Sequence, residues 1–260
     1  DWNLDIDHVR LLITPNTRAV ISVNLYGNPS NSEELRSLCD KNGIFLVEDC
    51  AESLGATYAG IKSGKLAHIS TFSFYGNKTI TTGEGGAIYT EIDSIYDRCI
   101  RLKSQGLAKQ REYWHDMIGY NFRMTNIEAA IGVAQLQKID TILRKKREID
   151  SLYRSYLKDT CAFQGFADKA NSSCWMTTIL VDNETVRDNL RSYLSTKGIE
   201  TRPTFYPVHT MPMYSKRYHW LPNTETISLR GINLPSYPDL GFEDIKSICM
   251  SVLDGIKMLY

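Results

Sequence analysis

A strand–helix–strand pattern near the start of the chain constrains its fold more than any other feature. Residues 19–25 (AVISVNL) form a continuous apolar run, typical of a strand buried on both faces of a parallel sheet. Residues 26–29 (YGNP) form a turn, and Ser32 then caps a helical pattern that runs to about Lys41. A second apolar strand follows at residues 44–47. This βαβ order predicts an α/β fold with a parallel sheet.

The next segment, residues 47–90, places polar groups at the ends of strands. Asp49 ends the strand at 44–47, and a strand at residues 69–74 runs into a turn, then Lys78, then a hydroxyl-rich and glycine-rich stretch at residues 79–86. A further strand is expected at residues 87–90. Open α/β sheets carry their chemistry at such strand ends, so a ligand site is predicted here.

Lys78 is the candidate reactive group of this site. A primary amine can condense with an aldehyde or ketone when it can lose its proton. The alternative is a solvated surface lysine, which is the usual state of this residue type. The preceding strand carries Thr71, Ser73 and Tyr75 on one face, and this polar face leads directly to Lys78. The flanking residues therefore favour the functional interpretation.

Asp49 admits two interpretations. A carboxylate at the end of a strand can keep a pyridine nitrogen protonated, which is how enzymes that use pyridoxal phosphate employ an acid. The same residue could cap a helix beginning at residues 50–52. The aspartate alone does not decide between the two.

Composition excludes several other classes of protein. Thirty basic and thirty acidic residues cancel, so the charge gives no reason to expect nucleic acid or membrane partners. The six cysteines show no CxxC spacing and the five histidines no metal-binding spacing, so no metal is expected. Reduced thiols and the lack of a long apolar run indicate a cytoplasmic protein.

Three strings resemble the DegT/DnrJ/EryC1/StrS sugar aminotransferases: residues 47–52 (VEDCAE), 73–78 (SFYGNK) and 82–86 (TGEGG). Residues 113–127 and 200–214 extend the resemblance over nearly the whole chain. It implies pyridoxal 5'-phosphate as cofactor and the aspartate aminotransferase (type I) fold of pyridoxal-phosphate-dependent transferases. A large cofactor-binding domain would span residues 1–150, and a small α+β domain residues 151–260. The large domain would lack the family's N-terminal portion.

The resemblance also implies roles for individual cofactor-binding residues. Lys78 would hold the cofactor covalently and move the proton, as the catalytic residue. Asp49 would pair with the pyridine nitrogen, and Glu52 would lie near the ring hydroxyl, where many relatives have glutamine. Ser73 would bind the phosphate, and Asn121 would reach the phosphate bound by the partner subunit of a homodimer.

Three further residues are implied to bind substrate. Arg123 is a candidate for the carboxylate of the amino donor, because a guanidinium suits bidentate pairing. Pairing with a local acid is the alternative. Tyr206 and His209, in a loop rich in aromatic residues and proline, could stack on or bond a sugar nucleotide. Packing between domains is the alternative for both.

The implied reaction is transamination of a nucleotide-linked 4-keto-6-deoxy sugar for O-antigen synthesis, with GDP-4-keto-6-deoxy-mannose as acceptor and glutamate as donor. Lysine at position 78 favours transamination, because relatives with histidine there are dehydratases. Two alternatives stay open: another nucleotide-sugar aminotransferase, or an inactive remnant that folds or dimerises without holding cofactor.

The remaining sequence predicts mainly helices. One helix is expected at residues 92–104 and one long helix from about residue 126 to about 149. Short strands and helices then alternate, with helices at residues 184–196 and from 242 to about 259. This change of pattern predicts the α+β unit.

Overall fold

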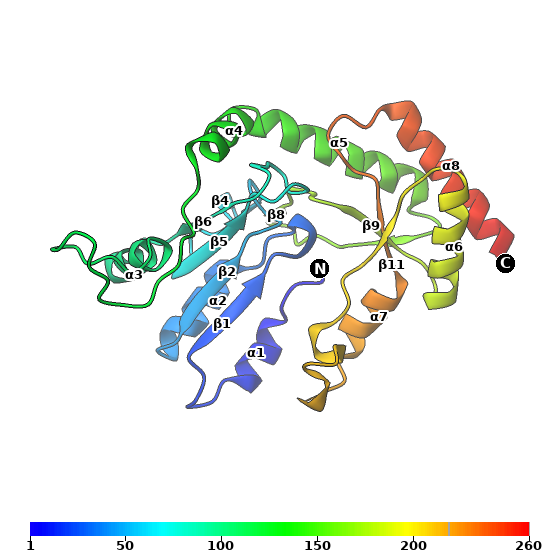
Figure 1. Ribbon diagram of the computed structural model, residues 1–260. Helices are drawn as coiled ribbons and strands as arrows, with labels where there is room; N and C mark the ends of the chain where they lie inside the picture. Colours follow the sequence, from blue (N-terminus) through cyan, green and yellow to red (C-terminus); the bar gives the residue numbers. More distant parts are fainter. Residues whose placement is uncertain (218, 260) are drawn as a thin grey trace. The chain divides into compact units, whose positions relative to one another are not determined.

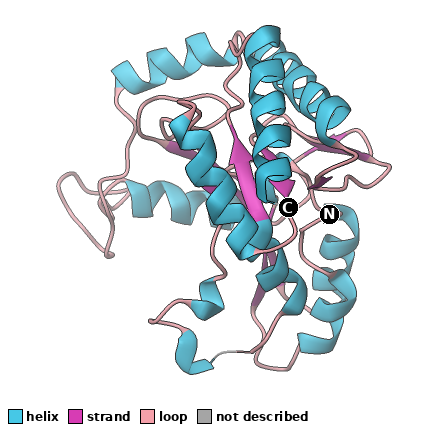
Figure 2. Ribbon diagram, turned by 90° about the vertical axis from the view of Figure 1, so that its right-hand side faces the viewer, coloured by secondary structure: helices cyan, strands magenta, loops and turns pink. Residues whose placement is uncertain are grey.

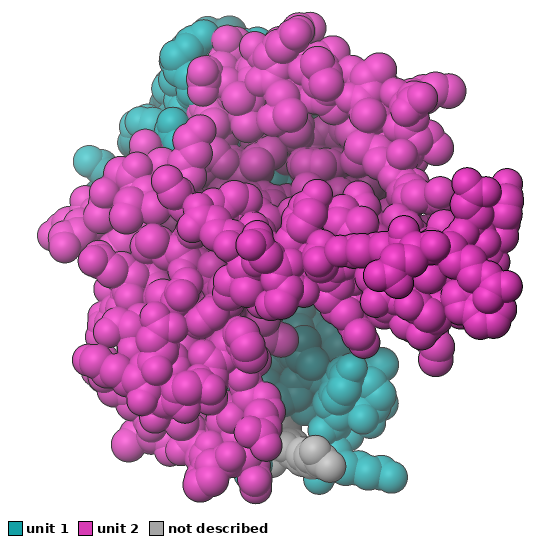
Figure 3. All heavy atoms as spheres, turned by 90° about the vertical axis from the view of Figure 1, so that its left-hand side faces the viewer, with its two compact units in different colours: residues 1–2, 144–166, 174–260 teal, residues 3–143, 167–173 magenta. Residues whose placement is uncertain are grey.

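The computed structural model describes residues 1–217 and 219–259. Two compact units divide the chain: unit 2 holds residues 3–143 and 167–173, and unit 1 holds residues 1–2, 144–166 and 174–260 (Figure 3). Each unit is described by itself. The division expected at residue 150 stays a prediction.

A four-stranded sheet forms the centre of unit 2. Its order is β1 (Ala19–Val23), β2 (Phe45–Asp49), β5 (Ile69–Ser73) and β6 (Gly86–Tyr89) (Figure 1). The first three strands are parallel and β6 is antiparallel to β5. Helix α2 (Ser32–Lys41) connects β1 to β2, which confirms the predicted βαβ unit and the α/β class.

The buried side of this sheet packs against α2 and against α1 (Ile6–Leu12). Leu35 of α2 and Leu46 of β2 are fully buried in the resulting apolar cluster. Asn31 caps α2, because its side chain accepts a hydrogen bond from the backbone N–H of Glu34. The predicted cap, Ser32, is instead the first residue of the helix, so the cap and the start of α2 both lie one residue earlier than predicted.

Smaller elements complete unit 2. They are η1 (Leu25–Gly27), β3 (Thr57–Tyr58), β4 (Ile61–Lys62), β8 (Ala170–Asn171), α3 (Asp93–Lys103) and α4 (Asn126–Leu136). The two-residue strands form a separate sheet of order β4-β3-β8. Between α3 and α4 the chain forms a long loop that projects from the rest of the unit (Figure 1).

The prediction of one long helix from residue 126 to 149 is wrong. Helix α4 ends at Leu136, and α5 (Ile139–Leu157) begins a new helix. Around the break, the N–H of Gln137 bonds to the carbonyl of Val133, and the N–H of Lys138 bonds to the carbonyl of Gln135. The second is an i→i−3 contact, which tightens the last turn. No glycine or proline marks residues 137–138, so local sequence gives no stop signal.

Unit 1 is built on an antiparallel sheet of order β10 (Arg202–Pro203), β11 (Gly231–Leu234), β9 (Thr177–Leu180) and β7 (Ala162–Phe163). Its helices are residues 144–157 of α5, α6 (Glu184–Thr196), α7 (Pro222–Arg230) and α8 (Phe242–Leu259), with short 3-10 turns η2 (Val208–Thr210) and η3 (Ser215–Arg217). Helices α6 and α8 lie side by side (Figures 1 and 2). The predicted bounds of both helices are confirmed, whereas α7 was not predicted.

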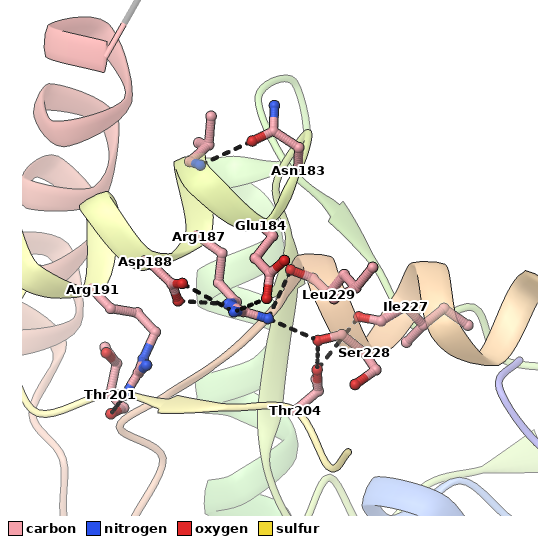
Figure 4. A network of polar contacts seen from close by, with 11 residues as sticks. Asn183, Glu184, Arg187, Asp188, Arg191, Thr201, Thr204, Ile227, Ser228 and Leu229 are labelled. Atoms are coloured by element: carbon pink, nitrogen blue, oxygen red, sulfur yellow. Dashed lines mark hydrogen bonds and ion pairs between the residues drawn. The ribbon is translucent and has the colours of Figure 1, made fainter. Parts of the chain in front are cut away.

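Arg187 joins two of these helices through a buried guanidinium. It is 2% exposed and donates to the carboxylates of Glu184 and Asp188 on its own helix, α6 (Figure 4). It also donates to the carbonyls of Ser228 and Leu229, at the end of α7. Because these carbonyls have no helical partner of their own, the arginine both caps α7 and ties it to α6.

Candidate active site

Lys78 lies in the loop between β5 and β6, which backbone hydrogen bonds hold in a compact form. The N–H of Lys78 donates to the carbonyl of Tyr75 at 3.0 Å, and the N–H of Thr82 donates to the carbonyl of Phe74 at 2.9 Å. The side chain of Lys78 is 14% exposed. The site lysine is therefore largely enclosed, which argues against the solvated interpretation.

Glu52 is the charged partner of this lysine. Its Oε1 lies 3.9 Å from Nζ of Lys78, and the glutamate side chain is 8% exposed. Its Oε2 accepts a hydrogen bond from the backbone N–H of Tyr26 at 2.6 Å. The pKa of Glu52 is raised to about 7. Burial is the largest cause and the charge of Asp49 adds to it, while the Tyr26 hydrogen bond and the Lys78 charge oppose the rise.

Asp49 ends β2 on the same edge of the sheet. Its Oδ1 accepts from the N–H of Ala51 at 3.0 Å, and its carbonyl accepts from the N–H of Asn24 at 3.1 Å. No helix begins at residues 50–52, which lie in a bend within the described part of the chain. The helix-cap alternative is therefore wrong, and the local bond is an Asx-type turn.

Asn24 braces the turn that carries Asp49 and Glu52. Its Nδ2 donates to Oε1 of Glu48 at 2.8 Å and to the hydroxyl of Ser53 at 3.0 Å. Its Oδ1 accepts from the N–H of Ser30 at 2.8 Å. Asn24 and Glu48 are almost fully buried, at 0% and 1% exposure, so these bonds have no competition from water.

Ser73, Asn121 and Arg123 also belong to unit 2. Ser73 ends β5, beside β2, and its hydroxyl accepts from the N–H of Tyr75 at 3.3 Å. In the loop before α4, Nε of Arg123 donates to Oδ1 of Asn121 at 3.0 Å. The observed partner of Arg123 is thus an amide and not the local acid of the alternative interpretation.

Two glycines let α4 lie against the loop that follows Lys78. A Cβ added at Gly132 would stand 3.0 Å from Cγ2 of Thr82, and one at Gly85 would stand 2.9 Å from Cε of Met124. The N-terminal part of α4 is thereby held beside residues 82–85 within unit 2. Thr125 fixes that end of the helix through a capping box with Glu128.

Tyr206 and His209 lie in unit 1, in the segment around η2. Tyr206 is exposed at 55%, and Nε2 of His209 lies 3.2 Å from Oε1 of Glu225. Neighbouring Phe205 stacks on Trp175, with 6.4 Å between the ring centroids. A sugar-binding role for Tyr206 and His209 stays a prediction.

Residues 1–217 and 219–259 contain no group of three or more histidine, cysteine or acidic residues arranged to hold a metal ion. No helix in the same part of the chain has the length and apolar character needed to cross a membrane.

The residues of unit 2 fit pyridoxal phosphate chemically. An enclosed amine can bond its carbonyl, a carboxylate can pair with its ring nitrogen, and strand-end hydroxyls can bond its phosphate. Lys78, Asp49 and Ser73 supply these groups at one edge of the sheet. An α/β sheet with such a set at its carboxyl edge meets the chemical requirements of a pyridoxal-phosphate-dependent enzyme of fold type I.

Comparison with known proteins gives the family. Residues 1–253 match the DegT/DnrJ/EryC1/StrS aminotransferase family, and the chain belongs to it. It is 47% identical over 251 residues to a GDP-perosamine synthase of Escherichia coli O157:H7, covering 96% of this chain and 69% of that protein. A GDP-perosamine synthase of Vibrio cholerae is 44% identical, with 95% of this chain and 68% of that protein covered.

A solved structure supports the fold independently. The aminotransferase PseC of Helicobacter pylori, which takes part in pseudaminic acid biosynthesis, superposes with a TM-score of 0.93 at 28% identity. The match covers 98% of this chain and 71% of that one. The structural match confirms the predicted type I fold, and the family together with its relatives confirms the aminotransferase class and the pyridoxal phosphate cofactor.

The residues that support Glu52 were not predicted. Asn24, Tyr26 and Ser173 all contact the turn at residues 50–53, and Ser173 Oγ donates to the carbonyl of Glu52 at 2.9 Å. Tyr26 has a φ of 56°, a left-handed conformation that is uncommon for tyrosine. The sequence signal for this support is Asn24, a polar residue inside the apolar run at residues 19–25.

Proposed function

We propose that this chain transfers an amino group from glutamate to the 4-keto carbon of GDP-4-keto-6-deoxy-mannose, forming GDP-perosamine for O-antigen synthesis. The observation that carries the proposal is the enclosed Lys78–Glu52 pair in a chain that is 47% identical to a GDP-perosamine synthase. Its metabolic role would be to supply an amino sugar for the synthesis of a polysaccharide.

Pyridoxal phosphate supplies a carbonyl and an electron-withdrawing ring, through which nitrogen can pass from donor to acceptor. The residues of the chain would position it and move protons. Asp49 would hold the ring nitrogen protonated, Ser73 would bind the phosphate, and Glu52 would lie near the ring hydroxyl. Lys78 Nζ would carry the cofactor and then move the proton between carbon atoms.

Substrate binding would involve further residues. Arg123 would pair with the carboxylate of glutamate, which requires it to exchange its bond with Asn121 for the donor. Tyr206 and His209 would contact the sugar nucleotide by stacking and hydrogen bonding. An aromatic ring that is 55% exposed, as Tyr206 is, offers a face to which a flat group can bind.

The active form would be a homodimer in which Asn121 reaches the partner subunit's cofactor phosphate. Helix α4 supports this because none of its residues is buried. Ile127, Ile131 and Val133 of this helix are 77%, 44% and 57% exposed. Apolar side chains on both sides of a helix call for a covering surface, and a second copy of the chain would supply one.

The dimer can be tested on α4 itself. Ile131→Glu should shift the molar mass measured by light scattering from dimer towards monomer, because a buried unpaired charge strongly weakens an interface. Gln137→Glu, an exposed polar position just beyond the same helix, serves as the matched control. A wild-type chain that is monomeric at working concentration would refute this part of the proposal.

The compartment proposed for the chain is the cytoplasm. All six cysteines are free thiols, and five of them are buried. Persistent free thiols are typical of a reducing compartment. Sugar nucleotides and glutamate would be available there.

A discontinuous assay tests the activity. Formation of 2-oxoglutarate and of amino sugar is measured with glutamate and a panel of nucleotide-linked 4-keto sugars. We expect GDP-4-keto-6-deoxy-mannose to react with the highest kcat/KM, Lys78→Ala to lose turnover, and the exposed control Lys65→Ala to retain it. Preference for a different nucleotide or ring position would assign another member of the family, and full activity of Lys78→Ala would refute the mechanism.

A further inference from the structure

Glu52 is enclosed together with Lys78 but has few other partners that favour its charged form. Its Oε2 is occupied by the N–H of Tyr26, at 2.6 Å. Its Oε1 faces Nζ of Lys78 at 3.9 Å, and the two side chains are only 8% and 14% exposed. Neither water nor a second cation therefore competes strongly for this carboxylate.

Four effects act on the pKa of Glu52, in opposite directions. Lys78 and the amide of Tyr26 favour the carboxylate, while burial and the neighbouring Asp49 favour the neutral acid. With all four effects present, the pKa of Glu52 is about 7. Without the lysine charge, only the Tyr26 amide among these four effects would still favour ionisation of Glu52.

Lys78 must lose its charge to react with a carbonyl group, because only the neutral amine has a free electron pair. We propose that Glu52 takes up a proton when Lys78 loses its charge, so that Nζ and Oε1 exchange one proton inside the site. Glu52 is then a catalytic residue that holds the proton of Lys78. This inference deepens the proposed function by assigning the proton's destination.

The step balances without any added reagent. When the ammonium of Lys78 condenses with a carbonyl compound, a carbon–nitrogen double bond forms and two of its protons leave with the carbonyl oxygen as water. The remaining proton passes from Nζ to Oε1 once the flexible lysine side chain brings the two atoms from 3.9 Å to hydrogen-bond distance, and the carboxylate becomes a carboxylic acid. A glutamine at position 52 would accept no proton, so the proton would enter solvent instead.

The first test uses the cofactor-free chain and is independent of any transamination. The carboxyl carbon of Glu52, labelled with carbon-13 and identified through Glu52→Gln, is titrated by NMR in the wild type and in Lys78→Met, a neutral side chain of similar length. We expect the wild-type titration near neutral pH and a rise of about one to two pKa units, at least tenfold in proton affinity, in Lys78→Met.

Two controls sharpen this titration. Lys62→Met removes an exposed lysine of unit 2 and should leave the Glu52 titration unchanged. Asp49→Asn removes the neighbouring carboxylate and should lower the pKa of Glu52. An unchanged titration in Lys78→Met would overturn the proposal.

The second test counts protons on the complete site. Pyridoxal 5'-phosphate is added in weak buffer near pH 8, just above the pKa of Glu52, and released protons are measured with an indicator dye. Glu52→Gln should release roughly half to one proton more per bound cofactor than the wild type, because a rise of one to two pKa units at pH 8 protonates that fraction of Glu52. Equal release from the two chains would contradict the proposal.

The two proposals can fail separately. If pyridoxal phosphate does not become fixed on Lys78, the proposed function fails, and the Lys78→Met titration still decides the proton exchange. If Glu52→Gln does not fold, the carboxyl signal of wild-type Glu52, then assigned through Glu52→Asp, is followed before and after cofactor addition in place of the proton count. Conversion to the acid supports the exchange, and a persistent carboxylate overturns it.

Discussion

Tyr26 donates its backbone N–H to Oε2 of Glu52 at 2.6 Å, although 26 positions separate the two residues in sequence. Tyr26 itself has a left-handed backbone, with φ 56° and ψ 21°, in the turn that follows β1. Such backbone conformations cost free energy and are concentrated at functional sites. The turn at the end of β1 thus places the charged partner of the site lysine.

Asn24 should be sensitive to a change of charge. Asn24→Asp replaces the amide that donates to Glu48 with a second buried carboxylate, 2.8 Å from the first in the present geometry. We expect the free energy of unfolding to fall by roughly 3–5 kcal/mol, the usual cost of an uncompensated buried charge. Urea unfolding measures it, with the exposed Asn16→Asp as control.

A loss below 0.5 kcal/mol would show that the buried amide is not the source of this stability, since surface changes have effects of about that size.

Gly86 should not tolerate a side chain. A Cβ at this position would stand 2.7 Å from the carbonyl oxygen of Phe72, which is backbone and cannot rotate away. Gly86→Ala should lower the free energy of unfolding by about 1–3 kcal/mol through overpacking of the β5–β6 pair. Gly165→Ala, where an added Cβ meets nothing within 4 Å, is the matched control; equal thermal midpoints would contradict the expected clash.

Arg187 should not be replaceable by lysine. Its guanidinium reaches two carboxylates and two carbonyls at once, which a single ammonium cannot do (Figure 4). We expect Arg187→Lys to lower the free energy of unfolding by about 1–3 kcal/mol, because buried acceptors lose their donors.

Arg144 provides the comparison for this variant. It pairs with Glu148 at 2.9 Å on the surface, with both side chains more than half exposed. Arg144→Lys should change the free energy of unfolding by less than about 1 kcal/mol. The account of the buried network would be wrong if the two lysine variants unfolded at the same urea concentration.

His68 should make unit 2 less stable in acid. Its Nδ1 accepts from the N–H of Leu46 at 2.9 Å, so the folded state needs the neutral ring. Burial, with a contribution from the Arg36 charge, holds the pKa of His68 below its ordinary value, and Asp40 opposes this. A pKa lowered by folding means that the stabilisation is complete above about pH 6.5 and is lost as the pH falls through the folded-state value.

The measurement is urea unfolding between about pH 5 and 7.5 for the wild type and for His68→Asn, whose side-chain oxygen can accept the same hydrogen bond. The variant should show a shallower loss of stability on acidification. His8→Asn, at an exposed position, should follow the wild type. Parallel curves for wild type and His68→Asn would rule out this histidine as the source.

Elements with strong local signals were predicted well. The bounds of α6 match the expected helix, because Asn183 caps it and its apolar residues follow the helical period. The break between α4 and α5 was missed because no residue there disfavours a helix. The two-residue strands β3, β4 and β8 depend on pairing between distant segments, which a local pattern does not contain.

The candidate site also has a part that the sequence could predict and a part that it could not. The positions of Lys78 and Asp49 near strand ends could be predicted from the apolar strands that precede them, and their roles stay predictions. The bond from Tyr26 to Glu52 could not, because a backbone amide carries no sequence signature and its partner lies 26 positions away. The pKa of Glu52 follows from that three-dimensional setting and not from the residue type.

The central claim is that Lys78 carries the cofactor. The purified chain is mixed with pyridoxal 5'-phosphate, reduced with borohydride and digested, and the modified lysine is identified by mass spectrometry, with Lys78→Arg as control. The account predicts stoichiometric modification at Lys78, little at exposed Lys62 and Lys65, and none above background in Lys78→Arg. Modification spread over the exposed lysines, with Lys78 unmodified in a folded chain, would contradict it.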